Sequence, residues 1–219
     1  MAALLVDWLE RALGFIFPDR CAGCGHTGAL LCAACRAAAR PACEEQPPPP
    51  GLDAVVVAWR YEGSVRQAVH ALKYRRQRRV ARALADALAA TINERPHGDA
   101  LIPVPLHPRR LAERGFNQSA ELARHLARRW DVPLLAGGLV RQRDTGHQAR
   151  LGRRERQSNV AGAFAWHAPA PPPLHVILVD DVLTTGATLG ACAAALRAAG
   201  SRQVVALTLA RALLTGDYS

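Results

Sequence analysis

The stretch that decides the fold is "HVILVDDVLTTGATLG", residues 175–190. Four apolar residues, 176–179, lead directly into two adjacent carboxylates, Asp180 and Asp181. A short turn rich in hydroxyl groups and glycine follows, and then an alanine-rich helical pattern over 187–199. The stretch therefore predicts a buried strand, a tight turn and a helix, with two negative charges where the strand ends.

The same alternation of strand and helix extends over most of the chain. Short runs rich in β-branched or apolar residues predict further strands at 53–61, 100–106, 160–166 and 201–211. Apolar residues at helical spacing predict helices at 64–74, 80–92 and 117–130. Strands that alternate with helices favour an α/β fold with a mostly parallel sheet that is flanked by helices.

Length and composition limit the organisation of the chain. Its 219 residues, half of them hydrophobic, suffice for one full-sized domain and a small appendage. The proline run "EEQPPPPG" at 44–51 predicts a linker, because proline fits neither a helix interior nor a central strand. We expect an N-terminal helix, cysteine module and linker over 1–50, and one α/β domain over 51–219.

The N-terminal segment and the hydropathy indicate where the protein acts. No apolar run approaches the roughly 20 residues that a membrane span requires. The start of the chain lacks a basic leader and carries Asp7 and Glu10 within its apolar pattern, which makes it a poor secretory signal. We expect a cytoplasmic protein without a membrane span.

Four cysteines form two Cys-x-x-Cys pairs in "CAGCGHTGALLCAAC": Cys21, Cys24, Cys32 and Cys35. Two such pairs can offer four thiolates in a tetrahedron, which suits a structural Zn²⁺. Disulfides and a redox pair are the alternatives; a reducing compartment disfavours the first. Cys43 and His26 are candidate extra or substitute ligands, and Cys192 has the sequence context of a small core residue.

Arginine dominates the charge of the chain. The net charge is +10, and 27 of the 28 basic residues are arginine, which favours anionic partners but is also typical of a biased base composition. The segment 141–159 holds six arginines and one leucine and predicts a solvated loop. A second basic run is either the wet face of a helix or a track for a nucleic-acid backbone: Lys73, Arg75, Arg76, Arg78 and Arg79.

The order of residues in the opening stretch suits a specific ligand. In parallel sheets, ligands bind beyond the carboxyl ends of the strands, where helices begin. The N–H groups and hydroxyls of the turn at 184–188 would face an incoming phosphate there. Two carboxylates beside a phosphate need another partner, and the neighbouring hydroxyls of a ribose supply one. A nearby Mg²⁺ would lower the repulsion further. Ribose 5-phosphate satisfies both halves of the stretch.

Two other classes of protein fit parts of this pattern. A receiver domain also begins with a strand ending in paired aspartates, but it needs a second acidic strand end and a lysine further along. Only 38 residues follow Asp181, and none is lysine, which excludes that class. A plain strand–turn–helix unit with incidental acids is the other alternative.

These residues resemble a known family. "VILVDDVLTTGAT" resembles the phosphoribosyl pyrophosphate signature of type I phosphoribosyltransferases. The cysteine pairs, "YEGSVRQAVHALKYRR", "LIPVPLHPRRLAERGFNQSAELA" and "RDTGHQARLGRRERQSNVAGAF" extend the resemblance to the ComF family of competence-type proteins over nearly the whole chain. Many members carry a further pair of cysteines, whereas Cys43 stands alone here.

The resemblance implies roles for individual residues. The paired acids, Asp180 and Asp181, would bind the ribose hydroxyls of phosphoribosyl pyrophosphate with Mg²⁺. The turn would bind its 5-phosphate through Thr184, Thr185, Gly186, Ala187 and Thr188. A loop after an earlier strand would hold the pyrophosphate through Arg109, Arg110 and Arg114. A mobile hood would close over the site with Gln148, Arg156 and Asn159.

Two functions follow from the sequence. The first is Mg²⁺-dependent transfer of a phosphoribosyl group, or hydrolysis of phosphoribosyl pyrophosphate. Arginines and Mg²⁺ would then stabilise the departing pyrophosphate, and the arginine-rich loop would exclude water. The second is an accessory protein that holds single-stranded DNA during uptake or processing, with phosphoribosyl pyrophosphate as a regulator or a relic.

Overall fold

The computed structural model describes most of the chain and leaves its two ends and several internal segments undescribed. The described residues are 18–42, 47–74, 77–92, 94–143, 160 and 162–212. Several residues singled out above lie outside them: Cys43, Arg75, Arg76, Gln148, Arg156 and Asn159. Within the described part, no helix combines the length and the apolar character needed to cross a membrane.

A four-stranded parallel sheet forms the centre of the molecule. Its strands lie in the order β1 (Ala54–Arg60), β6 (Gln203–Arg211), β5 (His175–Leu183) and β2 (Ala100–Pro103). Seven consecutive residues of β6 are buried, as expected for a strand covered on both faces. The predicted α/β fold with a parallel sheet between helices is confirmed.

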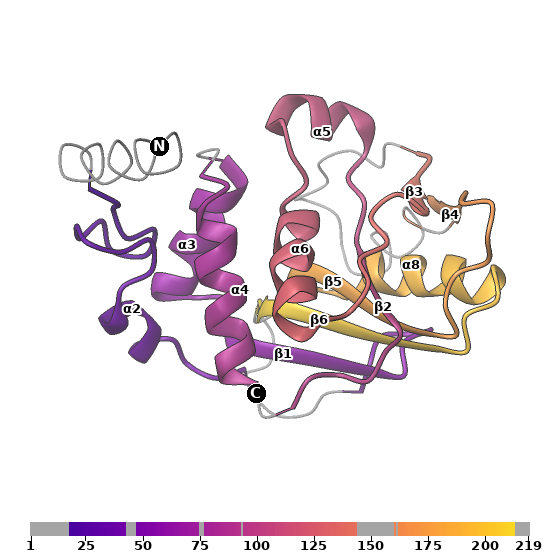
Figure 1. The fold of residues 1–219 in the computed structure, drawn as a ribbon, viewed down its shortest axis with the longest axis horizontal. Coiled ribbons are helices and arrows are strands. Elements are labelled where there is room, and N and C mark those ends of the chain that lie inside the picture. The colour runs from indigo at the N-terminus through magenta and orange to yellow at the C-terminus, as the bar shows by residue number, and fades with distance from the viewer. Residues whose placement is uncertain are drawn as a thin grey trace, which may run out of the picture.

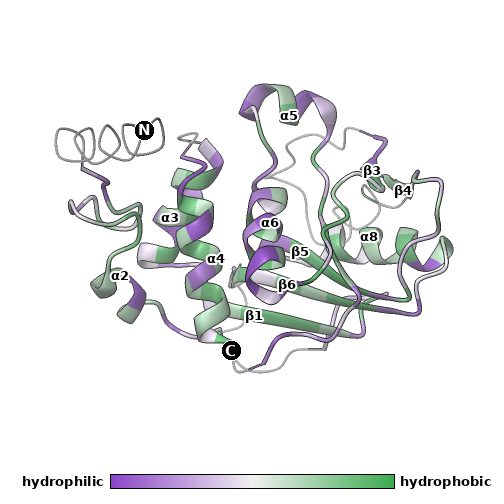
Figure 2. Cartoon of the chain, in the orientation of Figure 1, coloured by the Kyte–Doolittle hydropathy of each residue, from purple (hydrophilic) through white to green (hydrophobic). Residues whose placement is uncertain are grey.

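Helices cover the two faces of this sheet unequally, as Figure 1 shows. The helices α3 (Gly63–Tyr74), α4 (Val80–Thr91) and α6 (Gln118–Trp130) share one core cluster with Ile177 and Val179. The helix α8 (Ala187–Ala198) packs on the other face, against Val176 and Leu178. Alternate residues of β5 thus supply both cores, and Figure 2 shows apolar residues concentrated on the sheet and on helix faces that meet it.

Both edge strands of the sheet are covered by neighbouring chain. Pro41 forms an antiparallel bridge with Trp59 of β1, and Leu134 forms a parallel bridge with Leu101 of β2. Because an open edge strand presents unpaired backbone groups to other chains, these short pairings protect the sheet from edge-to-edge association. The first of them also ties the chain after the cysteines to the sheet.

Two short elements at the rim differ from the prediction. The segment between β2 and α6, expected as a loop, contains the helix α5 (Pro108–Arg114). Just before α5, the ring Nδ1 of His107 accepts a hydrogen bond from the backbone N–H of Arg109. Pro108 occupies the first turn of α5, and Gly115 ends the helix with a φ of 80°. The second element is an antiparallel pair outside the parallel sheet, β3 (Leu139–Arg141) and β4 (Phe164–Trp166), which packs near α8. β4 forms the end of the strand predicted at 160–166, whereas its partner β3 was not predicted.

Candidate functional site

The opening stretch forms the predicted strand, turn and helix, with one difference. The strand β5 does not end before the aspartates but continues through them to Leu183. Its neighbour β6 is equally long, so that Asp180 pairs with Thr208 and Val182 with Ala210 in the sheet. Both carboxylates therefore have fixed backbones within a parallel ladder, close to its carboxyl end.

Asp180 is held by the first turn of α6. Its Oδ1 accepts a hydrogen bond from Ser119 Oγ at 2.8 Å and one from the backbone N–H of Asp181 at 2.9 Å. Burial, together with the charge of Asp181, raises the pKa of Asp180 to about 7, although the bond from Ser119 and the charge of Lys73 oppose the rise. Asp180 therefore changes its charge near neutral pH.

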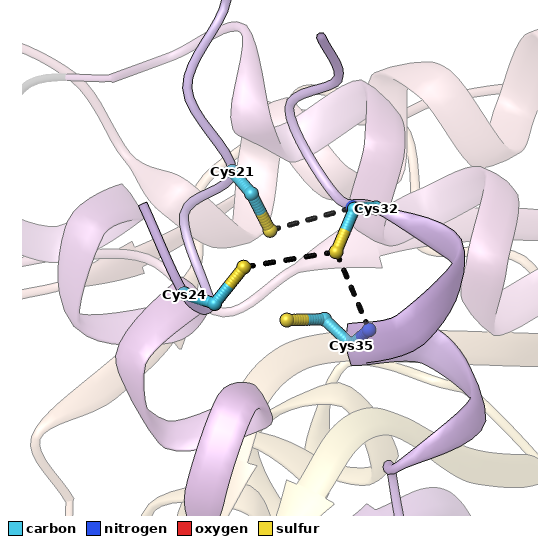
Figure 3. Close-up of side chains that lie close together, drawn as sticks. All are labelled: Cys21, Cys24, Cys32 and Cys35. Atoms are coloured by element: carbon cyan, nitrogen blue, oxygen red, sulfur yellow. Dashed lines mark hydrogen bonds between the residues drawn. The ribbon is translucent and has the colours of Figure 1, made fainter. Parts of the chain in front are cut away.

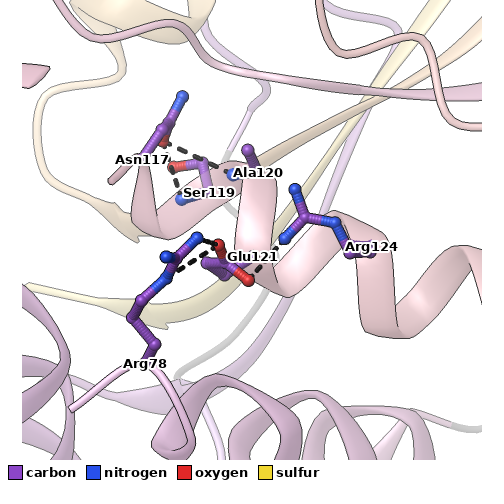
Figure 4. A network of polar contacts seen from close by, with 6 residues as sticks. All are labelled: Arg78, Asn117, Ser119, Ala120, Glu121 and Arg124. Carbon is purple, nitrogen blue, oxygen red and sulfur yellow. Dashed lines mark hydrogen bonds and ion pairs between the residues drawn. The ribbon is translucent and has the colours of Figure 1, made fainter. Parts of the chain in front are cut away.

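Ser119 owes its position to the cap of its helix. The side-chain oxygen of Asn117 accepts the backbone N–H groups of Ser119 and Ala120, as Figure 4 shows, and its amide donates to the carbonyl of Val104 at 2.9 Å. This cap fixes the start of α6 to the chain that follows β2. Sequence reasoning did not identify Ser119, although the Asn-x-Ser pattern at a helix start was a usable signal.

Asp181 is buried and paired with a lysine. Its Oδ1 lies 2.8 Å from Nζ of Lys73, and the two side chains are 4% and 19% exposed. Burial opposes the lysine charge, but the Asp181 carboxylate outweighs it and raises the pKa of Lys73. The sequence predicted that Lys73 belongs to an exposed basic run. This prediction is wrong, because the end of α3 turns Lys73 inward. Among the described residues, Asp181 Oδ2 is buried without a hydrogen-bond partner.

The turn after β5 has the form of an anion-binding helix start. Gly186 precedes α8 with a φ of 76°, and Thr185 Oγ1 accepts the N–H of Ala187 at 3.4 Å. Thr184 is exposed, whereas Thr185, Ala187 and Thr188 are half-buried. The polar groups of the turn are thus placed at the N-terminus of a twelve-residue helix, where partial positive charge favours an anion.

The arginines expected to bind pyrophosphate lie on or at the end of α5, which stands above α6 in Figure 1. Arg109 is exposed and pairs with Glu113 at 3.2 Å, and Arg110 is half-buried. Arg114 bonds to Gln118 and lies over the ring of Tyr74, 5.4 Å from its centroid. The hood residues Gln148, Arg156 and Asn159 lie outside the described part of the chain.

The four predicted metal ligands come together in space. Sγ atoms of Cys21, Cys24, Cys32 and Cys35 all lie within 4.8 Å of one another, and none of the four forms a disulfide, as Figure 3 shows. Burial opposes ionisation of Cys21, but backbone N–H groups, led by that of Cys32, lower its pKa to about 6. Four converging sulfurs fit a tetrahedral Zn²⁺ and leave no open position for catalysis.

The surroundings of the cysteine cluster tie it to the helices. The carbonyl of Cys35 accepts a hydrogen bond from Ser64 at the start of α3, and Asp19 pairs with Arg79 through two bonds of 2.8 and 3.2 Å. His26 is exposed and does not join the cluster, whereas Cys43 lies outside the described residues. The fifth described cysteine, Cys192, is buried in the core, as predicted.

The other described residues of the basic run, Arg78 and Arg79, are paired with acids. Arg78 pairs with Glu121, which also binds Arg124, as Figure 4 shows. The guanidinium of Arg78 also lies over the ring of Phe116, 5.4 Å from the ring centroid. Although burial opposes it, Arg78 and Arg124 hold the pKa of Glu121 below its ordinary value. The positive charge of the surface around Arg78 and Arg124 is therefore partly neutralised by Glu121.

Two cavities of ligand size lie near the site but not over the paired aspartates. A cavity of about 630 Å³ separates the cysteine module from α4 and α6, and its lining includes Arg36, Arg78, Arg79 and Arg82. A more apolar one of about 670 Å³ runs beside α8 and reaches the turn at 185–187. As far as the described residues define them, neither is lined by Asp180 or Asp181.

Comparison with curated proteins finds relatives over about three quarters of the chain. Competence protein F of Haemophilus influenzae is 33% identical over 171 residues, 74% of this chain and 75% of that protein. DNA utilization protein YhgH of Salmonella typhi is 34% identical over 177 residues, and that of Escherichia coli K12 is 35% identical over 178. These two matches span 78% and 77% of this chain, and 77% and 76% of the relatives. No protein-family model matches the chain.

Comparison with solved structures finds matches of low sequence identity. A protein from Thermus thermophilus, TT1426, is 18% identical with a TM-score of 0.33, over 66% of this chain and 86% of that one. Hypoxanthine phosphoribosyltransferase from Trypanosoma cruzi is 16% identical with a TM-score of 0.32, over 63% of each chain. Scores of this size add nothing to the sheet topology described above.

Proposed function

The chain belongs to the ComF/YhgH family of competence and DNA utilization proteins, and from this premise we propose that it binds phosphoribosyl pyrophosphate with Mg²⁺ and transfers the phosphoribosyl group to an acceptor. One observation carries the proposal: a carboxylate at the end of β5 is followed within six residues by a glycine-started helix N-terminus. A ribose with a 5-phosphate needs a partner of each kind: a carboxylate for its hydroxyls and an anion-binding helix start for its phosphate.

Each half of the ligand meets a suitable group. The half-buried Asp180 can accept hydrogen bonds from ribose hydroxyls when it is ionised, and the N–H groups and hydroxyls of 184–188 can bind the 5-phosphate. Arg109, Arg110 and Arg114 on α5 supply positive charge for the departing pyrophosphate. Mg²⁺, when bound with the ligand, neutralises part of the diphosphate charge.

We expect the rate enhancement to come from stabilisation of the departing pyrophosphate. Departure of pyrophosphate leaves positive charge on the anomeric carbon and gathers negative charge on the leaving oxygens. Loss of one preorganised contact to such a charge typically costs about 10² to 10³ in rate. Substitution of Arg114 by Met should therefore slow turnover of phosphoribosyl pyrophosphate more than it weakens its binding.

Calorimetric titration with phosphoribosyl pyrophosphate, with and without Mg²⁺, tests the proposal. We expect binding only in the presence of the metal, and loss of that binding in the double variant Asp180→Asn/Asp181→Asn. Asp86→Asn on α4 is the matched control, because the side chain of Asp86 is half exposed and its ion pairs with the described residues Arg82 and Arg129 are long, at 3.8 Å. Unchanged affinity in the double variant would sink the proposal.

A second function is favoured by the arginine-lined cavity and by the names of the relatives. The cavity between the cysteine module and α4 gathers four arginines, which suits the backbone of single-stranded DNA handled in the cytoplasm together with the DNA-uptake machinery. Phosphoribosyl pyrophosphate would then act as a regulator. Asp19, Asp86 and Glu121 in the same lining reduce its net charge and weigh against strong affinity.

Salt dependence separates this second function from general attraction to polyanions. Fluorescence anisotropy of a labelled oligothymidine should give an affinity that falls steeply with salt. Arg36→Gln/Arg82→Gln should flatten that dependence, whereas Arg128→Gln/Arg202→Gln, of equal charge but outside the cavity lining, should not. Equal loss in both double variants would exclude a defined DNA site at this cavity.

A further inference from the structure

We propose that Lys73 is a positioning residue: it holds Asp181 in a buried ion pair and so leaves Asp180 as the carboxylate that contacts the ribose hydroxyls. The identity of the ligand rests on the function proposed above. The two acids, for which the family resemblance implies one shared role, thereby take unequal roles.

The burial of Asp181 argues against direct contact with a ligand. Its residue is 3% exposed, one oxygen is bonded to Lys73, and the other is buried without a hydrogen-bond partner among the described groups. A ribose hydroxyl could reach Oδ1 only if the ion pair opened and left a buried ammonium without its partner, which is costly, and could reach Oδ2 only if the groups that bury it moved aside. Asp180 is more exposed, and the hydrogen bonds that it accepts from Ser119 and Asp181 both use Oδ1 rather than Oδ2.

A direct connection leads from Lys73 to Asp180. Lys73 fixes the side chain of Asp181, and the backbone N–H of Asp181 donates to Asp180 Oδ1. The helix that carries Lys73 is anchored by its neighbours Val69 and Leu72, which are buried in the core. A change at Lys73 therefore reaches Asp180 through two contacts, without any contact between Lys73 and the ligand.

The charges around Asp180 support the same division. Burial and the charge of Asp181 raise the pKa of Asp180, and the hydroxyl of Ser119 and the charge of Lys73 lower it. Cys192 approaches Asp180 from α8, and Tyr61 lies near enough to influence Lys73. Without the lysine, only the hydrogen bonds from Ser119 and from the backbone of Asp181 oppose this rise in the pKa of Asp180. Asp180 would then be protonated at neutral pH and would lose part of its capacity to accept from two hydroxyls.

Carbon-detected NMR titration of the unliganded protein tests the charge coupling without any ligand. In Lys73→Met we expect the pKa of Asp180 to rise by about one unit, which is about a tenfold change in its acid dissociation constant. Lys73→Arg keeps the charge and should restore most of the original value. An Asp180 titration that is the same in all three proteins would overturn the inference.

The binding of phosphoribosyl pyrophosphate with Mg²⁺ tests the unequal roles. We expect Asp180→Asn to abolish binding, and Lys73→Met to weaken it about fivefold at pH 7 and much less at pH 9, as the ionised fraction of Asp180 does. Since single variants leave one buried charge unpaired and can misfold, the double variant Lys73→Met/Asp181→Asn is the decisive one. It should recover most of the affinity that either single variant loses.

Two outcomes are distinguishable. If the double variant binds no better than Asp180→Asn while remaining folded, Asp181 itself contacts the ligand and the inference is wrong. If the unchanged protein binds no phosphoribosyl pyrophosphate at any pH, the proposed function fails, whereas the NMR titration still decides whether Lys73 controls Asp180.

Discussion

Gly186 shows at the residue scale how closely the turn after β5 is specified. Its φ of 76° disfavours any L side chain, and an added Cβ would lie 2.2 Å from Cγ of Pro49. Gly115, with a φ of 80° and nothing within 4 Å of an added Cβ, shares the backbone strain but not the collision. The turn is therefore fixed both by its own dihedral angles and by the proline-rich segment that lies against it.

The two glycines make a matched pair of variants. Gly115→Ala should cost about 1 kcal/mol of unfolding free energy from strain alone, and Gly186→Ala should cost about 1–3 kcal/mol more, because Pro49 or the turn must shift. Denaturant unfolding measures both values. Equal costs at the two positions would mean that Pro49 moves away without resistance.

The charge of Asp180 predicts a dependence of stability on pH. Its pKa is raised from 3.8 to about 7, so the folded state binds the proton more tightly than the unfolded state. The contribution of Asp180 to stability is therefore complete below about pH 4 and is lost as the pH rises to about 7. Asp180→Asn keeps an acceptor for Ser119 but does not titrate. Relative to the unchanged protein, we expect this variant to gain stability between pH 4 and 7 and to gain no more above pH 7, as measured by urea unfolding at each pH.

At the scale of elements, periodicity predicted the long helices and strands but not how their ends meet. The patterns at 64–74, 80–92 and 117–130 match α3, α4 and α6 within one residue at either end. The helix α5 was missed because two prolines break the pattern before it and it spans only seven residues. Short helices at a rim depend on caps and local turns, which leave little periodic signal.

The cap of α6 gives a prediction at the same scale. Asn117→Ala removes three hydrogen bonds and should cost about 1–2 kcal/mol of stability; it should also weaken ligand binding, because Ser119 loses its anchor to Asp180. Asn117→Asp keeps the cap and loses only the bond to Val104. Its stability in denaturant unfolding and its ligand affinity in calorimetry should therefore lie between those of the unchanged protein and of Asn117→Ala. Binding that is unaffected by either change would disconnect the cap from the site.

At the scale of the whole molecule, the contacts that sequence reasoning missed join distant parts of the chain. The carboxylate Asp181 lies 2.8 Å from an ammonium that precedes it by more than a hundred residues, and Ser119 bonds to Asp180 across 61. Charge pattern alone marked Lys73 as exposed, because its neighbours in sequence are basic. The four cysteines were predictable because they are close in sequence and their chemistry admits few arrangements.

The cysteine cluster should stabilise more than its own segment. Its contacts to Ser64 and Arg79 lie at the starts of α3 and α4, and the residues that follow it pair with β1. We expect about one zinc per chain by elemental analysis, with chelation raising hydrogen exchange first in 18–42 and then at the starts of these helices. Cys32→Ser should reproduce the effect, whereas Cys192→Ala should keep the metal.

Because α3 also carries Lys73, loss of zinc should weaken the ion pair with Asp181 and shift the titration of Asp180 in the same direction as Lys73→Met. A zinc-free chain with unchanged exchange throughout α3 would separate the cluster from the site.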